Sequence, residues 1–396
     1  MPADTSVKYF HSAMPGAPVL SGTAGSLINV LDACLVNGFG VSAVASLVVA
    51  GGVATATISG GHSGEVGSVM LVAGATPSGL NGEKKLLSVG AGNTTLTFDA
   101  TGISDQTATG SITVKMAGAG WLKSFSGTNL AAYKSGDVAA SQCLLRVDDT
   151  AAKVARVVGY ESMTGISAGT GPFPTATQRS GGTFWAKSNV ADGSGRLWVL
   201  VADTRMAYLI MRYHSSYTTS TNFVAFGDLL SVKSGDAWGC VLSGYSSDLS
   251  GSAPGDANDY GTMRAAGGAD ELFLARSHTA LGGSCRANKS FAIPILPSAS
   301  TAFASGSGPQ RYPNGPDSGI WVGPHYISES TDQSIRGMSP GFFCCPQWVP
   351  YDWVAFNFSM TGVSQLPGRE LRVNTFGADI AALCGFAFFD VTGPWR

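Results

Sequence analysis

The residues most able to do chemistry in this sequence are its carboxylates, because a β-rich chain with aromatic loops could be a glycosidase. Such enzymes need two Asp or Glu side chains at about 5–10 Å across a sugar cleft. The candidates are Asp148, Asp149, Asp192, Asp270 and Glu271. Adjacent residues on a strand point to opposite faces, so neither neighbouring pair forms a dyad by itself. Most acidic residues lie in Gly/Ser turns, where Asp caps its own backbone. We therefore expect no enzyme.

Nucleophile and phosphate motifs are also incomplete. The segment Gly61-His62-Ser63-Gly64-Glu65 approaches the G-x-S-x-G elbow of a serine hydrolase, but the final Gly is missing and no helix is predicted after it. A polar hairpin turn is the simpler interpretation. The segment Gly79–Lys84 lacks the spacing and the Gly-Lys-Ser/Thr ending of a phosphate-binding loop.

Metal-ligating residues show no recognisable spacing. The five histidines form no i, i+4 pair and no H-E-x-x-H motif: His11, His62, His214, His278 and His325. The segment Asp256–Asp259 resembles a fragment of a calcium loop without the downstream Gly and bidentate Glu. We assign no catalytic, cofactor-binding or metal-binding residue.

The cysteines are odd in number, widely spaced and without a C-x-x-C pair: Cys34, Cys143, Cys240, Cys285, Cys344, Cys345 and Cys384. This pattern predicts neither a disulfide framework nor a structural zinc site. Most are flanked by apolar residues and are expected in cores, as in a chain that folds in a reducing cytosol.

The aromatic residues could report sugar or protein binding. Trp348, Tyr351 and Trp353 cluster after Cys344-Cys345-Pro346, and Trp395 lies beside Arg396. Aromatic platforms bind sugars, but aromatic side chains also fill β-sandwich cores and subunit interfaces. We take core or interface as the default interpretation.

The composition sets the class of protein. Only 13% of the 396 residues are charged, the net charge is −2, and 53 residues are Gly, whereas soluble proteins carry about 25% charged residues. A nucleic-acid binder would be basic, and a disordered chain would be less hydrophobic than this 44%. The uncharged stretch between Asp32 and Glu65 is broken by glycines and alternates with Ser and Thr, which favours strands over a membrane span. The opening Met1–Asp4 leads into no signal-peptide pattern.

The hydrophobic pattern predicts a mainly β fold with a small N-terminal β-module and one helix, followed by a larger β-sandwich-like domain. Residues 1–20 form an arm, residues 21–124 the helix and small β-module, and residues 125–396 the sandwich-like domain with long loops. Leu27, Leu31 and Cys34 recur at helical spacing, with Thr23 as cap and Asn37-Gly38 as stop.

Period-two runs separated by turn residues predict the strands. In the module, Gly51-Gly52 is a hairpin loop between the strands 47–49 and 53–58, and further strands lie at 68–73, 85–89, 94–98 and 110–116. In the larger domain, strands are predicted at 183–187, 196–202, 206–213, 222–226, 238–242, 353–358, 370–374 and 384–390. Residues 245–320 are predicted to be mostly loops, of the kind ordered by a neighbour.

Two parts of the chain resemble virion proteins of tailed bacteriophages. The likeness is carried by Gly60-Gly61-His62, Val69–Ala75, Leu80–Glu83, Thr95–Asp99 and Gly110–Val114 in the module, and by Ile335–Phe342, Pro367-Gly368-Arg369 and Gly393–Arg396 near the end. Where related endings read Leu-Pro-Gly-Leu, this chain has Met338-Ser339-Pro340-Gly341-Phe342. The resemblance implies a virion component and carries no catalytic group.

We therefore expect a structural component of a bacteriophage virion, at the tail tip or baseplate, that assembles symmetrically with its own copies and with other virion proteins. An interface disfavours unpaired charges, which fits the scarcity of charged residues. Assembly would take place in the host bacterial cytoplasm. The alternatives are a head-decoration or neck protein, a receptor- or glycan-binding tail protein, and a polysaccharide-degrading enzyme. No cofactor, nucleic acid or membrane span is expected.

Overall fold

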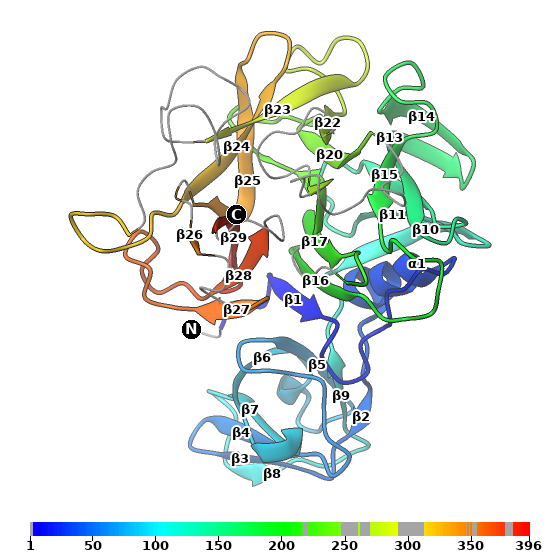
Figure 1. Cartoon of the computed structure of the whole chain (residues 1–396). Helices are drawn as coiled ribbons and strands as arrows, with labels where there is room; N and C mark the ends of the chain where they lie inside the picture. Colours follow the sequence, from blue (N-terminus) through cyan, green and yellow to red (C-terminus); the bar gives the residue numbers. More distant parts are fainter. Residues whose placement is uncertain are drawn as a thin grey trace.

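The computed structural model describes residues 3–216, 221–246, 260–261, 270–291, 313–345, 347, 349–350, 355–376 and 383–396. Within them the chain is mainly β with one α-helix, as expected (Figure 1). The strands form two sheets, a smaller one of eight strands and a larger network of 21 strands. Figure 1 shows the smaller sheet below the rest of the molecule.

The smaller sheet is built from residues 42–116 in the order β2-β9-β5-β6-β7-β4-β3-β8. Its strands are β2 (Ser42–Ala43), β3 (Ser46–Ala50), β4 (Val53–Thr57), β5 (Val69–Ala73), β6 (Gly82–Val89), β7 (Thr95–Asp99), β8 (Gln106–Thr107) and β9 (Thr113–Met116). All the strands predicted in this segment are confirmed. Gly51 and Gly52 both have positive φ, at 58° and 77°, as a two-residue hairpin loop requires.

The larger network begins with a meander that the sequence analysis did not divide into strands. It consists of β10 (Trp121–Gly127), β11 (Leu130–Ser135), β12 (Leu144–Asp148), β13 (Val154–Gly165) and β14 (Ala168–Phe173). Predicted strands follow as β15 (Thr183–Ala186), β16 (Leu197–Ala202), β17 (Met206–Arg212), β18 (Asn222–Asp228) and, shifted by two residues, β20 (Cys240–Tyr245), with β19 (Leu230–Ser231) between the last two.

The second half of the network contains strands that were not predicted. Residues 245–320 were expected to be mostly loops; their described part includes β22 (Asp270–Leu274) and β23 (Cys285–Phe291), which pair with β20 and β24 (Gly323–Glu329), and residues 247–259, 262–269 and 292–312 lie outside the described residues. The predicted strand at 353–358 is wrong for residues 355–357, because residues 356–357 lie in a turn and β27 begins at Phe358. The remaining strands are β21 (Tyr260–Gly261), β25 (Ile335–Cys344), β26 (Val349–Pro350), β27 (Phe358–Met360), β28 (Leu371–Phe376) and β29 (Leu383–Asp390).

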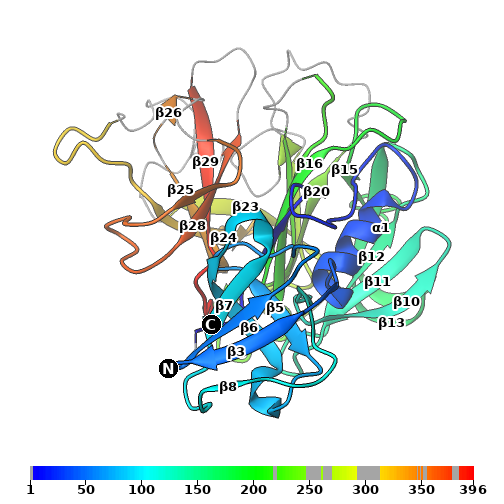
Figure 2. The ribbon, with the colours of Figure 1, turned by 90° about the horizontal axis from the view of Figure 1, so that it is seen from below.

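The arm enters the larger network as a strand. β1 (Lys8–His11) pairs antiparallel with β16, and Lys8 lies opposite Ala202. The helix α1 (Ser26–Leu31) continues into a π-helical turn, η1 (Asp32–Asn37), and lies beside β10 and β11 in Figures 1 and 2. Gly38, at φ 71°, ends it as predicted. A π-helical turn contains about one residue more than an α-helical turn. Within it, the Cys34 carbonyl accepts a hydrogen bond from the backbone N–H of Ala119.

The predicted cap of this helix is wrong. Gly25, not Thr23, is the N-cap residue, and it offers no side-chain cap. The carboxylate of Asp149 instead accepts hydrogen bonds from the backbone N–H groups of Leu27 and Ile28, at 2.8 and 3.2 Å. A residue more than a hundred positions away therefore satisfies the helix N-terminus, which local sequence patterns cannot reveal.

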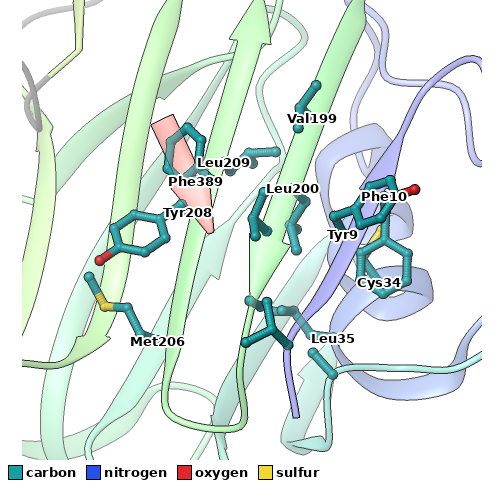
Figure 3. Packing of buried hydrophobic residues seen from close by; sticks show 14 of the residues in the cluster. Tyr9, Phe10, Cys34, Leu35, Val199, Leu200, Met206, Tyr208, Leu209 and Phe389 are labelled. Atoms are coloured by element: carbon teal, nitrogen blue, oxygen red, sulfur yellow. The ribbon is translucent and has the colours of Figure 1, made fainter. Parts of the chain in front are cut away.

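One hydrophobic core joins the arm, the helix and both halves of the larger network. Figure 3 shows Tyr9 and Phe10 of β1 beside Cys34 of the π-helical turn, while Tyr208 and Leu209 of β17 lie on the other side of β16; all belong to the same buried cluster. Tyr208 contacts Phe223, Phe342, Phe389 and Trp395, with ring centroids 5.4–6.2 Å apart. Among the cysteines whose burial is described, Cys34, Cys143, Cys240, Cys344 and Cys345 are buried and Cys285 is half-buried, all as free thiols, which confirms their predicted place in cores.

Candidate functional site

Three of the carboxylates considered as glycosidase candidates are held by neighbouring side chains of the protein itself. Asp149 forms a fully buried ion pair with Lys187. Its neighbour Asp148 faces the surface, where it accepts hydrogen bonds from Thr150. Asp192 pairs with Arg196, at 3.3 Å. Each of these three carboxylates therefore has a structural partner within the chain.

Only one carboxylate of the second candidate pair has a described side chain. Glu271 is buried and accepts a bidentate pair of bonds from Arg179, at 2.6 and 3.0 Å, while Arg286 lies at 3.4 Å. Asp270 begins β22, in register with Tyr245. The side chain of Asp270 lies outside the described residues, as does the calcium-like segment Asp256–Asp259.

The Gly61–Glu65 segment is not the hairpin turn that was predicted, because it connects β4 and β5, which pair with other strands rather than with each other. His62 is buried; its Nδ1 accepts from the Gly64 N–H, so its Nε2 donates to the Thr95 carbonyl at 3.2 Å. Burial lowers the pKa of His62, which keeps the ring neutral. The Ser63 hydroxyl donates to the Pro15 carbonyl rather than to a histidine. Ser63 therefore holds this segment against the arm, whereas His62 connects it to Thr95 within the smaller sheet.

A group of polar residues, which we call the junction cluster, connects the smaller sheet to the rest of the chain. It consists of Tyr9, His11, Glu65, Glu370 and Arg372. The Glu65 carboxylate lies 2.8 Å from His11 Nε2, 3.3 Å from the Tyr9 hydroxyl and 3.4 Å from Arg372. The Arg372 guanidinium also stacks on the Tyr9 ring, 4.1 Å from its centroid. The sequence analysis missed this cluster because its members come from three distant segments.

The junction cluster predicts a pH dependence of stability. Burial tends to raise the pKa of Glu65, but the hydrogen bond and charge of His11 and the charge of Arg372 outweigh it, so the pKa lies below its ordinary value of 4.5. Stability from such a group is complete above pH 4.5 and is lost as the pH falls through the folded-state pKa. We expect Glu65→Gln to lose less than about 1 kcal/mol at neutral pH, because the side chain is partly exposed.

Urea unfolding of both proteins between about pH 3 and pH 6 measures this effect. The stability of the unaltered protein should fall more steeply with acidification than that of Glu65→Gln. Parallel curves would contradict the assignment of the lowered pKa to Glu65.

A second polar group, which we call the hairpin cluster, lies in the larger network. It consists of Asp236, His278, Glu329, Asp332 and Arg336. The buried Arg336 guanidinium binds Asp236 at 2.6 and 2.7 Å and Glu329 at 2.5 Å. His278 Nδ1 lies 3.2 Å from Glu329 Oε2 and 3.9 Å from Asp332 Oδ2. The sequence offered no signal for this group, because its histidine and carboxylates lie on separate hairpins without a spacing motif.

The outer face formed by β3, β4 and β7 of the smaller sheet is almost uncharged, whereas β6 and β9 carry Glu83, Lys84, Lys85 and Lys115. Alternating burial along β3, β4 and β7 turns one residue in two away from the core. The outward residues are Ser46, Val48, Ala50, Val53, Thr55, Thr57, Thr95, Thr97 and Asp99. Val48, Thr55 and Thr97 form one row across the three strands. The row presents apolar methyl groups and hydroxyls to its surroundings, and Asp99 is the one charged residue among these outward positions.

The predicted aromatic cluster cannot be assigned to core or surface, because Trp348, Tyr351 and Trp353 lie outside the described residues. Trp395 is buried, and its Nε1 donates to the Asp390 carbonyl at 2.8 Å. It is therefore a core residue, in line with the default interpretation.

Comparison with known proteins does not assign the chain to a family. No protein-family model matches the chain, and no curated protein matches it. Within the described residues, no helix is long and apolar enough to cross a membrane.

Proposed function

We propose that this protein is a structural component of a bacteriophage virion, at the tail tip or baseplate, and that it acts by symmetric assembly with its own copies and other virion proteins. The observation that carries the proposal is the outer face formed by β3, β4 and β7 of the smaller sheet, on which Asp99 alone of nine outward residues is charged. The likeness of the module and the chain ending to tailed-bacteriophage virion proteins points to the same class.

The physical argument concerns desolvation. A charged side chain loses its hydration when a partner covers it, and it recovers that free energy only if it is well paired. Val and Thr on a pleated surface lose little hydration and offer β-branched side chains with few rotamers to immobilise. Some charged residues of the described chain are buried in ion pairs instead, as in Lys187–Asp149 and Arg336–Asp236. An exterior of this kind suits a subunit whose neighbours cover it.

The first test introduces charge into the outer face. We expect the double variant Val48→Lys, Thr55→Lys to fold normally but to shift assembly towards the monomer, because like charges brought together at an interface cost several kcal/mol. Val138→Lys is the matched control, since Val138 is 93% exposed and lies outside this face. Light scattering coupled to size-exclusion chromatography measures the masses.

Two results would count against assembly through this face. The unaltered protein could remain a monomer at all concentrations, or the double variant could assemble as well as Val138→Lys does. Circular dichroism of each variant verifies that the β fold is retained.

The second test concerns the position in the particle. Immunogold labelling of intact particles with an antibody against residues 126–396 should place gold at the tail tip. Gold on the capsid would contradict the tail placement and support the head-decoration alternative.

A further inference from the structure

Three ligand-type side chains of the hairpin cluster converge from two hairpins. His278 lies in the connection between β22 and β23, and Asp332 lies in the connection between β24 and β25, three residues after Glu329. β23 and β24 pair with Ala287 opposite Glu329, which brings both connections to one end of the network, at the top of Figure 1. The ligand atoms of His278, Glu329 and Asp332 all lie within 4.8 Å of one another.

Each carboxylate has one oxygen held in place and the other turned towards the histidine. Glu329 Oε1 accepts from Arg336 and from the His278 backbone N–H, while Oε2 faces His278 Nδ1. Asp332 Oδ1 accepts from the N–H and hydroxyl of Ser334, at 3.0 and 2.6 Å, while Oδ2 faces the same nitrogen. In metal sites, the ligand side chains are regularly oriented by hydrogen bonds from surrounding groups to the atoms that do not bind the metal.

We propose that His278, Glu329 and Asp332 bind a divalent transition-metal ion of the Zn²⁺ type. Zn²⁺ binds imidazole nitrogen and carboxylate oxygen at about 2.0–2.2 Å, so neighbouring ligands of a tetrahedral ion lie roughly 3.4 Å apart. The separations of 3.2 and 3.9 Å from Nδ1 to the two oxygens lie on either side of this value. His278 and Asp332 are nearly half exposed, so water can complete the coordination.

The local charge also favours a cation. Asp236, Glu329 and Asp332 carry three negative charges against one positive charge on Arg336, which leaves an excess of two. The Lys233 ammonium, which donates to the His278 carbonyl at 2.7 Å, offsets part of this excess. One proton on His278 bridges only one carboxylate well, whereas a divalent ion binds both. The ion would cross-link the two hairpins and stiffen this end of the network.

Isothermal titration of the full chain with ZnCl₂ tests the proposal. We expect one Zn²⁺ per chain, and we expect His278→Ala and Asp332→Asn each to weaken binding at least about 10-fold. Bound Zn²⁺ should also raise the unfolding temperature of the unaltered protein but not that of His278→Ala. The matched controls are His214→Ala and Asp192→Asn, which should bind as the unaltered protein does.

Three outcomes would overturn the site. The unaltered protein could fail to bind Zn²⁺ at about 1 mM, a concentration at which even weak sites are occupied. Binding could persist in both His278→Ala and Asp332→Asn. Binding could instead be lost in Cys285→Ser and retained in the two ligand variants, which would assign Zn²⁺ to the half-buried thiol of Cys285. Should His278→Ala misfold by circular dichroism, the Asp332→Asn titration decides the question alone, because that side chain is exposed and retains its shape.

Discussion

Replacing Lys187 with alanine is expected to lower the free energy of unfolding by about 3–5 kcal/mol. Lys187 and Asp149 are both fully buried, and removal of the ammonium leaves the Asp149 carboxylate without its counter-charge in the core. The ammonium also donates to the Thr23 carbonyl at 2.6 Å, just before the helix. Burial raises the pKa of Asp149 and lowers that of Lys187, so desolvation favours the neutral form of each group, and their mutual attraction opposes it.

The chain provides a matched control for this prediction. Asp148 is adjacent to Asp149 but lies at the surface, 3.7 Å from Arg146. Asp148→Asn should therefore change stability by less than about 1 kcal/mol, whereas Asp149→Asn should be as damaging as Lys187→Ala. Urea unfolding followed by tryptophan fluorescence measures all three. Equal effects of Asp148→Asn and Asp149→Asn would show that the buried pair is not what fixes the helix.

Replacing Trp395 with alanine is expected to cost about 3–5 kcal/mol, the range for removing a large aromatic side chain from a core. The ring is 7% exposed, packs edge-on against Tyr208 at 5.8 Å, and lies against the backbone of Gly341. An added Cβ at Gly341 would meet the Trp395 ring at 2.1 Å, and its φ of 62° also disfavours other residues. Gly341→Ala should thus destabilise the same contact, by about 1–3 kcal/mol or more.

Trp321→Ala is the control for the loss of a tryptophan, because Trp321 is 45% exposed. Its effect should stay within about 1 kcal/mol. Thermal and urea unfolding measure the three variants. A loss for Trp395→Ala no larger than that for Trp321→Ala would mean that the chain ending does not contribute to the core.

The contact between Trp395 and Gly341 also connects two segments that carry the resemblance to virion proteins. Met338–Phe342 forms part of β25, and the Gly393–Arg396 ending lies against it. Arg396 adds an ion pair with Asp203 at 2.8 Å. These motifs therefore have a packing role in the fold.

The sequence predicted the elements whose information is local. Alternation and paired glycines located the hairpin around Gly51-Gly52 and the strands from Thr183 to Phe226, because period-two burial and positive φ leave a direct mark on neighbouring residues. The strands β22 and β23 were missed because turn-forming residues surround them and their pairing partners come from other segments. The helix was found from its apolar spacing, but its cap was not, since Asp149 supplies it from β12's end.

The candidate site was less predictable than the fold. His278 and Glu329 are 51 positions apart, and neither lies in a spacing that signals a metal site. Only the pairing of β23 with β24 brings their hairpins together. The junction cluster likewise forms only because the fold brings the arm, the Gly61–Glu65 segment and β28 into contact.

The sequence by itself determined that this protein is mainly β, rich in turn glycines and sparing in charge. Those properties follow from residue type and short-range periodicity, which act through neighbouring backbone groups. Only the tertiary structure decided which charge meets which: Lys187 with Asp149 in the core, Arg372 with Glu65 at the junction, and His278 with two carboxylates at the hairpins. The energy of a charge depends on its burial and on partners within a few ångströms, and both are set by strand pairing between distant segments.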